Sequence, residues 1–239
     1  MMVEPNSKRF VDSFIQIEEY LQKELGNGDY KPFKSLVDHV AKSNTVIKLY
    51  QDELNSFGNL RNAIVHTRAE NSEPIAEPHD SVVELIERIV REITTPEKVI
   101  PKFSRQVISF DHENSLMDVL LLIKETSYSQ FPIYKYGEFR GLLTENGITA
   151  YIASIVEKER IDFSTIKLAD VIKLEEIKNN YIFISRDTNV YEAMDLFKKE
   201  IGTLNRVKLD ALLITENGKK EEELLGIMTA WDMLDIVEF

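Results

Sequence analysis

The spacing of apolar residues changes character partway along the chain. Up to about residue 95, apolar side chains recur every three or four positions, which places them on one face of a helix. From about residue 102, short apolar runs alternate with helical stretches, a pattern typical of strands and helices in one domain. The sequence therefore predicts an α+β fold, in which an all-α helical bundle precedes a part that contains strands.

The first part contains helical segments with short breaks between them. Gly26 and its neighbours end the first helix, and Gly58 is expected to break the third. Residues 60–67 either continue the third helix or start another. The predicted helices cover residues 7–25, 33–41, 45–57 and 80–93. Pro96 and Pro101 close the pattern, so we assign residues 1–98 to a helical bundle and residues 99–239 to a second domain.

The second domain contains an internal repeat with the order strand, helix, strand, strand, helix. Residues 107–110 and 181–184 form the first strand of each copy, and each is followed by apolar residues at helical spacing. Each copy then has two strands, and the second of these ends in glycine, two apolar residues and threonine, at residues 141–144 and 226–229. Repeat one covers about residues 102–156 and repeat two about residues 168–239.

Two such units in tandem resemble a CBS domain pair, a module named for cystathionine beta-synthase. The family usually binds adenosine-containing ligands in the cleft between its halves. Its motif is glycine, apolar, any residue, threonine or serine, two residues, aspartate, and residues 226–232 match it fully. The resemblance implies that Asp232 holds the ribose hydroxyls and that Thr229 lies near ribose or phosphate. A carboxylate offers acceptor oxygens to a cis-diol, and the helix expected after Thr229 would present N–H groups to phosphate.

The first copy departs from this motif because Gly147 stands in place of the aspartate. Asn146 offers only a neutral substitute, so Thr144 marks a poorer or empty site, and we expect one good nucleotide site per chain. The ligand candidates are AMP, ADP, ATP and S-adenosylmethionine. Thr229 and Asp232 also fit an ordinary helix N-terminus that binds nothing, and some CBS pairs serve only in dimerisation. Both alternatives stay open.

One segment of the helical part, residues 60–66, resembles the motif of the HEPN superfamily. These are helical bundles in which arginine, a polar residue, three further residues and histidine mark many metal-independent ribonucleases. The resemblance, over about residues 7–95, implies that Arg61 stabilises the scissile phosphate, that His66 acts as general acid or base, and that Asn62 orients the histidine or the RNA. Histidine suits this role because it titrates near neutral pH. Many members of the superfamily are inactive interaction modules, and Arg61 also has acidic neighbours with which to pair.

Helix geometry limits how these three residues can meet. On an ideal helix, Asn62 and His66 share a face and Arg61 does not. Arg61 must therefore wrap around the helix, precede a local break, or act across a dimer. Both family resemblances imply a homodimer.

Composition narrows the classes of function. The chain has no cysteine, which excludes disulfides, thiol catalysis and thiolate metal sites, and no carboxylate–histidine spacing indicates a metal. The net charge of -12 disfavours broad affinity for nucleic acid, so DNA is not an expected partner. The sequence has neither a membrane-spanning apolar run nor signal-peptide features at Met1–Asn6, and we expect a cytoplasmic protein with no membrane partner.

Three functions fit these observations. The first is a regulator whose CBS pair binds an adenine nucleotide and controls an HEPN-like bundle, with no other cofactor required. The second is a nucleotide-controlled, metal-independent endoribonuclease that uses Arg61, Asn62 and His66 on RNA. The third is a structural dimer or interaction module with neither activity.

Overall fold

The computed structural model divides the protein into two compact units, residues 1–97 and residues 98–239. The fold is α+β, with helices in the first unit and two small sheets in the second. The structure describes residues 4–26, 31–66, 76–157, 160–175, 179–201 and 209–235.

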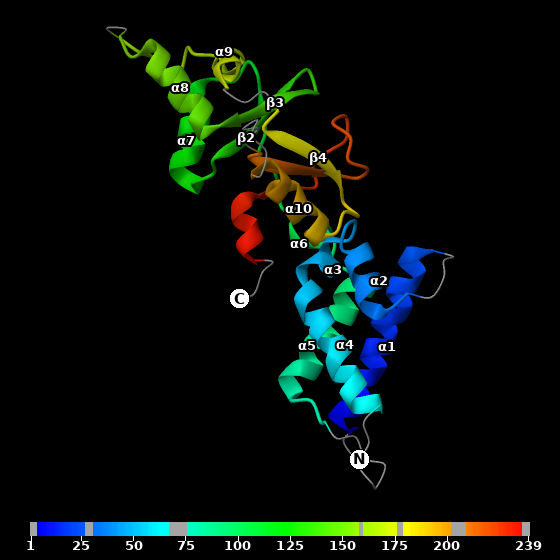
Figure 1. The fold of residues 1–239 in the computed structure, drawn as a ribbon. Coiled ribbons are helices and arrows are strands. Elements are labelled where there is room, and N and C mark those ends of the chain that lie inside the picture. Colours follow the sequence, from blue (N-terminus) through cyan, green and yellow to red (C-terminus); the bar gives the residue numbers. More distant parts are fainter. Residues whose placement is uncertain are drawn as a thin grey trace. The chain divides into compact units, whose positions relative to one another are not determined.

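The first unit is a helical bundle (Figure 1). Its helices are α1 (Asn6–Leu25), α2 (Phe33–Val40), α3 (Thr45–Leu49), α4 (Gln51–His66) and α5 (Asp80–Thr94). Helix α1 packs against α2, α4 and α5, and the apolar stripe expected on it is buried at Phe10, Phe14, Ile17 and Leu21. The 3.6-residue period of a helix brings such positions to one side, so their burial supplies the main stabilisation of the bundle.

The break predicted at Gly58 is wrong. Helix α4 runs through Gly58 without interruption, and the interruption lies at Tyr50, between α3 and α4. A Cβ atom at position 58 would lie 3.3 Å from the ring of Phe33. The glycine therefore serves close packing between α4 and Phe33 at the start of α2, and this tertiary contact outweighs its low helix propensity.

The second unit contains two three-stranded sheets with the same topology. Repeat one comprises α6 (Val99–Lys102), β1 (Phe110–Asp111), α7 (Leu116–Thr126), β2 (Gln130–Lys135), β3 (Glu138–Thr144) and α8 (Glu145–Ile155). Repeat two comprises α9 (Leu168–Val171), η1 (Ile172–Leu174), β4 (Tyr181–Ser185), α10 (Val190–Ile201), β5 (Ala211–Thr215), β6 (Gly226–Thr229) and η2 (Ala230–Asp235). In each sheet the first strand pairs in parallel with the second, and the second pairs antiparallel with the third. This shared topology confirms the predicted internal repeat.

Two predicted elements differ from the structure. Strand β1 begins only at Phe110, because residues 105–109 lie outside the sheet and four of them line a cavity instead. The helix expected after Thr229 is a short 3₁₀ helix in the described residues, and its first turn already holds the Asp232 carboxylate. The Thr229 N–H is thereby occupied by Asp232, and the phosphate site at this helix start stays a prediction.

The segment at the start of each repeat packs against the other repeat. We call residues 98–106 the first arm and residues 167–175 the second arm. In the first arm, the N–H of Val99 donates to the carbonyl of Thr188, at 2.9 Å. In the second arm, the N–H of Leu168 donates to the carbonyl of Asn114, at 3.0 Å. The two repeats are thus held together by reciprocal exchange of their arms.

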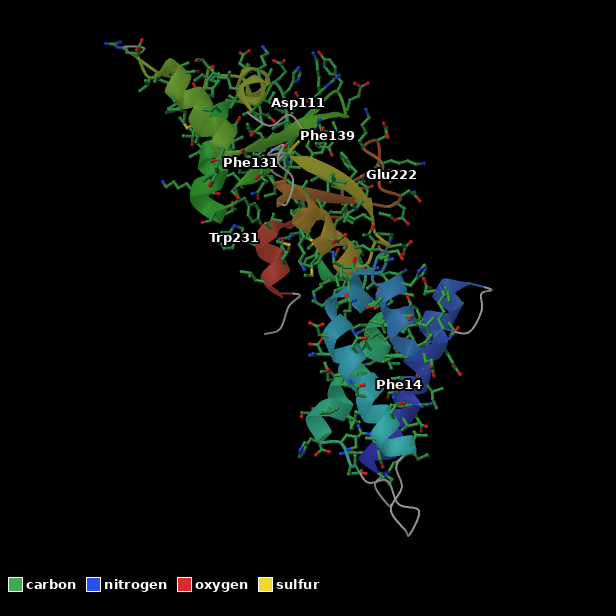
Figure 2. The ribbon with its side chains drawn as sticks, in the orientation of Figure 1. Phe14, Asp111, Phe131, Phe139, Glu222 and Trp231 are labelled. Atoms are coloured by element: carbon green, nitrogen blue, oxygen red, sulfur yellow. The ribbon has the colours of Figure 1, made fainter. Side chains whose placement is uncertain are left out.

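Aromatic contacts join the two sheets. Phe139 of β3, labelled in Figure 2, meets Tyr181 and Phe183 of β4 edge to face. The ring centroids are 4.9 and 5.0 Å apart. Leu142, Ala211 and Leu213 are buried beside this cluster. Such contacts fix how the repeats meet, and therefore where the arm of one lies on the motif of the other.

Candidate functional site

The two residues predicted to bind ligand in repeat two lie together. Thr229 is the last residue of β6, and Asp232 lies in η2. Asp232 Oδ2 accepts hydrogen bonds from the Thr229 N–H, at 2.6 Å, and from Thr229 Oγ1, at 2.9 Å. The aspartate side chain is 16% exposed, so it is only partly buried.

Arg105 of the first arm joins this pair, and the sequence analysis did not identify it. Its Nη2 atom donates to both oxygens of Asp232, at 2.8 and 2.9 Å. Its Nε atom donates to the carbonyl oxygen of Ile227, at 2.8 Å. Arg105 precedes Asp232 by more than a hundred residues, and no motif links them. Only the exchange of arms brings them into contact.

A cavity of about 150 Å³ lies beside Arg105 and Thr229. Trp231, the one tryptophan of the chain, lines it and is 78% exposed (Figure 2). Tyr128 lines the cavity from the loop before β2. Polar side chains and backbone complete the wall: Gln106, Val107, Ile108, Ser127, Ser129, Gln130 and Ile227. The cavity therefore combines aromatic faces with amide and hydroxyl groups, which is the usual chemistry of a small-molecule site.

The corresponding motif in repeat one already contains a carboxylate, from the second arm. Glu175 Oε2 accepts from the Thr144 N–H at 2.9 Å, and Thr144 Oγ1 lies 3.1 and 3.0 Å from the two Glu175 oxygens. Thr144 and Glu175 are both buried. A Cβ atom on Gly147 would lie 2.2 Å from Glu175 Oε2, so the glycine provides the space for this carboxylate. Asn146, proposed from the sequence as a substitute for the aspartate, is exposed in the first turn of α8.

The HEPN-like motif lies on α4, and the structure describes two of its three side chains. Arg61 Nη1 donates to Asn62 Oδ1 at 3.4 Å, and the Arg61 guanidinium lies 5.9 Å from the centre of the Phe14 ring. Helix α4 ends at His66, whose side chain is outside the described residues. Arg61 and Asn62 nevertheless line one cavity, although they are adjacent on a continuous helix.

This cavity of the helical unit has a volume of about 440 Å³. Phe14 and Phe33 form one wall, with ring centroids 4.3 Å apart, and Lys34 adds a second cation. Glu18 and the amides of Asn55 and Asn59 also line it. The cavity thus carries cations, amides and aromatic rings, and one acid.

The described part of the chain contains neither a cluster of metal ligands nor a membrane-spanning helix. Nowhere within it do three histidine or acidic side chains gather as a metal site would require. None of its helices has the length and apolar character needed to cross a bilayer.

Comparison with known proteins identifies the second unit. The family model of the CBS domain matches residues 98–154 and 170–238. A search of curated protein sequences returned no match. Among solved structures, the chain is similar to a hypothetical conserved protein from Geobacillus kaustophilus, with 21% identity and a TM-score of 0.41 over 59% of this chain and 96% of that one.

Two further solved structures are similar at lower identity. One is the CBS domain pair of protein MJ0100 in complex with 5′-methylthioadenosine and S-adenosyl-L-methionine (15% identity, TM-score 0.41, 59% of this chain and 95% of that one). The other is CBSX2 in complex with AMP (14% identity, TM-score 0.41, 59% of this chain and 95% of that one). The predicted tandem CBS pair is confirmed by the family match, which covers more than half of the chain and both repeats. This protein belongs to the CBS domain family.

Proposed function

We propose that the CBS pair binds one adenosine-containing ligand per chain at the repeat-two motif, and that its occupancy regulates the helical unit. The observation that carries this proposal is the partly exposed Asp232 carboxylate, held by Thr229 and paired with Arg105, next to a cavity lined with aromatic rings. Two carboxylate oxygens suit the cis-diol of a ribose. The neighbouring cavity suits the base.

The dimensions of the cavity fit part of the base rather than the whole ligand. A protein cavity of about 150 Å³ is sufficient to bind one aromatic ring such as benzene, so it accommodates at most part of the base, while the sugar and any phosphate lie at the mouth near Asp232. Trp231 and Tyr128 offer faces for stacking on the base. The amide and hydroxyl side chains of Gln106 and Ser129 are placed to meet the polar edge of an adenine ring.

The geometry of repeat one supports a stoichiometry of one ligand per chain. Its motif threonine, Thr144, is buried and already hydrogen-bonded to Glu175. Removal of Glu175 would leave the Thr144 N–H and hydroxyl without an acceptor, at a cost of about 1–3 kcal/mol each. A ligand at this position would have to overcome that cost. We therefore assign the ligand to repeat two alone.

The chain itself supplies a route for regulation. Helix α5 of the helical unit ends at Thr94, and the first arm begins at Lys98. The same arm carries Arg105 and Gln106, which line the ligand cavity. A ligand that displaces these side chains changes the conformation of a segment connected directly to the helical unit. Occupancy therefore couples to that unit through the arm.

Titration calorimetry with AMP, ADP, ATP and S-adenosylmethionine tests this function. At least one should bind with a stoichiometry of about one and change the fluorescence of Trp231, the one tryptophan. Asp232→Ala should weaken binding about tenfold or more, because a hydrogen bond to a charged group contributes about 1.5–3 kcal/mol. Absence of binding by all four ligands, or equal affinity in Asp232→Ala, would remove the assignment.

A second candidate function is metal-independent cleavage of RNA by the helical unit. It is favoured by the cavity that Arg61 and Asn62 share with Lys34, since two cations beside aromatic rings suit a phosphate and a base. Purified protein should then degrade unstructured RNA in the presence of a chelator, and His66→Ala should abolish the activity. Equal RNA decay in the wild type and in His66→Ala would leave the unit as an interaction module.

Homodimerisation is the third element of the proposal. Exposed apolar side chains lie on or next to helices of the CBS pair, at Leu121 of α7, Val156 after α8 and Leu234 of η2. A symmetric dimer would bury such positions. Light scattering should give twice the chain mass, and a monomer mass at all concentrations would contradict it.

A further inference from the structure

We propose that Arg105 makes the repeat-two site selective for adenosine ligands that carry a phosphate. In the absence of ligand, Arg105 pairs with Asp232, and on binding it exchanges this carboxylate for the phosphate of the ligand. The inference rests on the proposed function, because it concerns the same site. It adds the class of ligand and the residue that selects it.

While Arg105 is bound, the Asp232 carboxylate has too few free acceptor positions for a diol, because Oδ2 is fully occupied and only one position remains on Oδ1. A carboxylate provides about four lone-pair positions. Oδ2 accepts from the N–H and the hydroxyl of Thr229 and from Arg105 Nη2, and Oδ1 accepts from the same nitrogen of Arg105. A ribose diol needs two acceptor positions. Arg105 must therefore leave at least one oxygen before the diol can bind.

Arg105 is free to make this movement. Its side chain is 41% exposed, so the ion pair is screened by water and is weak. The residue precedes β1 on a segment outside the sheet, so its movement disrupts no strand pairing. The side chain also lines the cavity in which we place the ligand. A small rotation of its flexible stem moves the guanidinium from the carboxylate to the mouth of the cavity.

The displaced guanidinium sets the charge of the preferred ligand. Arg105 loses two contacts with an anion when the diol takes Asp232, and a phosphate on the ribose restores them, because its oxygens match the guanidinium fork. Unphosphorylated adenosine leaves the arginine without that replacement. S-adenosylmethionine has a positively charged sulfonium next to the ribose, where AMP has its phosphate, and so offers the guanidinium no anion at that position. Selectivity thus comes from an exchange of partners rather than from the shape of the cavity.

The rival explanation is that Arg105 only fastens the first arm to repeat two through Ile227 and Asp232. Under that explanation its loss would loosen the arm and weaken all ligands by a similar factor. Under the proposed exchange, its loss has opposite effects on two ligands. AMP loses its phosphate partner, whereas adenosine gains a carboxylate that is no longer occupied.

Calorimetry with AMP and adenosine on the full chain separates these explanations. Wild-type protein should bind AMP at least tenfold more tightly than adenosine. Arg105→Gln should weaken AMP at least tenfold and strengthen adenosine severalfold, and Arg105→Lys should retain part of the preference for AMP. Lys98→Gln is the matched control, because Lys98 lies on the same arm, pairs with Asp187 and does not line the cavity. It should leave both affinities unchanged.

The experiment distinguishes failure of the proposed selectivity from failure of the proposed nucleotide site. Equal affinity of the wild type for AMP and adenosine overturns the selectivity, and this comparison needs no variant that might misfold. Equal weakening of both ligands by Arg105→Gln also overturns it and leaves the arginine as a fastener of the arm. If wild-type protein binds none of AMP, ADP, ATP, adenosine and S-adenosylmethionine, the proposed nucleotide site itself fails.

Discussion

In both repeats of the CBS pair the motif threonine donates to a carboxylate, but the two carboxylates come from different parts of the chain. In both, a threonine at the end of a strand directs its N–H and hydroxyl at a carboxylate oxygen. Repeat two uses Asp232 of its own motif, and repeat one uses Glu175 of the second arm. Glu175 is buried, whereas Asp232 is partly exposed and paired with a half-exposed arginine. A similar contact is therefore buried in one repeat and partly exposed in the other, where we propose the ligand site.

The arms explain this difference. Each arm passes close to a glycine of the opposite repeat, since a Cβ on Gly226 would lie 2.2 Å from the carbonyl oxygen of Phe103, and one on Gly141 would lie 3.0 Å from Ile172 Cδ1. Beyond these points the first arm presents Arg105 and the second presents Glu175. A cation reaches a motif that has its aspartate, and an anion reaches the motif that lacks it. The first arm therefore supplies a cation for an aspartate, and the second arm supplies an acceptor for the N–H and hydroxyl of Thr144.

The largest expected effect comes from adding a methyl group at Gly226, where the backbone of the first arm lies against repeat two. In Gly226→Ala the new methyl group would overlap the backbone of Phe103, which cannot move without displacing the arm. We expect a loss of about 3 kcal/mol in the free energy of unfolding, measured by denaturant titration. Gly147→Ala is the comparison, because its methyl group meets the end of the Glu175 side chain rather than backbone. An equal loss in both variants would contradict the difference between the two contacts.

Removal of the buried carboxylate in repeat one should affect stability and leave ligand binding intact. Glu175→Ala deprives the Thr144 N–H and hydroxyl of an acceptor, and we expect a loss of about 1–3 kcal/mol in the free energy of unfolding. Glu175→Gln keeps an acceptor oxygen and should lose less. Ligand affinity, measured by calorimetry, should stay within a factor of two. A large fall in affinity would place Glu175 in the ligand site.

Removal of the exposed Trp231 indole should weaken ligand binding and leave stability almost unchanged. Trp231→Ala should weaken an adenosine ligand by about 1 kcal/mol, or roughly fivefold, because a stacked aromatic pair contributes about 0.5–1.5 kcal/mol. Stability should hardly change, since the side chain is 78% exposed. Tyr136→Asn removes another exposed aromatic, in the turn between β2 and β3, and should not change the affinity. Unchanged affinity in Trp231→Ala would exclude stacking at this position.

The smallest expected effect on stability comes from the loop between β5 and β6, which differs from the turn between β2 and β3. The turn between β2 and β3 is closed by Tyr136 and Gly137, both at positive φ, whereas the longer loop before β6 depends on Glu222. The Glu222 carboxylate accepts from the Asn217 N–H and side-chain amide, both at 2.7 Å. The Asn217 N–H is the main cause that lowers the pKa of Glu222 from 4.5 to about 2.

A lowered carboxylate pKa gives a definite sign to the pH dependence. The contribution of Glu222 to stability is fully present above pH 4.5 and is lost as the pH falls from there towards 2. Glu222→Gln should therefore melt at a slightly lower temperature than the wild type at pH 7, and the difference should shrink over that window. Glu221→Gln, a neighbouring exposed carboxylate, is the control. A constant difference across the window would show that Glu222 does not act through its charge.

Periodicity and the repeated motif determined most of the fold and half of the candidate site. The apolar stripe of α1, the order of strands in both repeats and the position of Thr229 and Asp232 follow from residues close together in sequence, because helix and strand periods are local properties. The sequence did not predict the extent of α4. The helix continues through Gly58, where the ring of Phe33 packs against the glycine. Local propensity can be read from a sequence, but the contact that overrides it cannot.

The tertiary structure alone decided the partners of the two motifs. Glu175 is separated from Thr144 by 31 positions and Arg105 from Asp232 by 127, and neither belongs to a motif. Their contacts depend on the exchange of arms and on the packing of Phe139 between the sheets. Such long-range geometry is set by the burial of the whole core, to which residues from the entire domain contribute. The sequence therefore identified the motif at which we propose a ligand, and the packing of the repeats determined which charged group faces it.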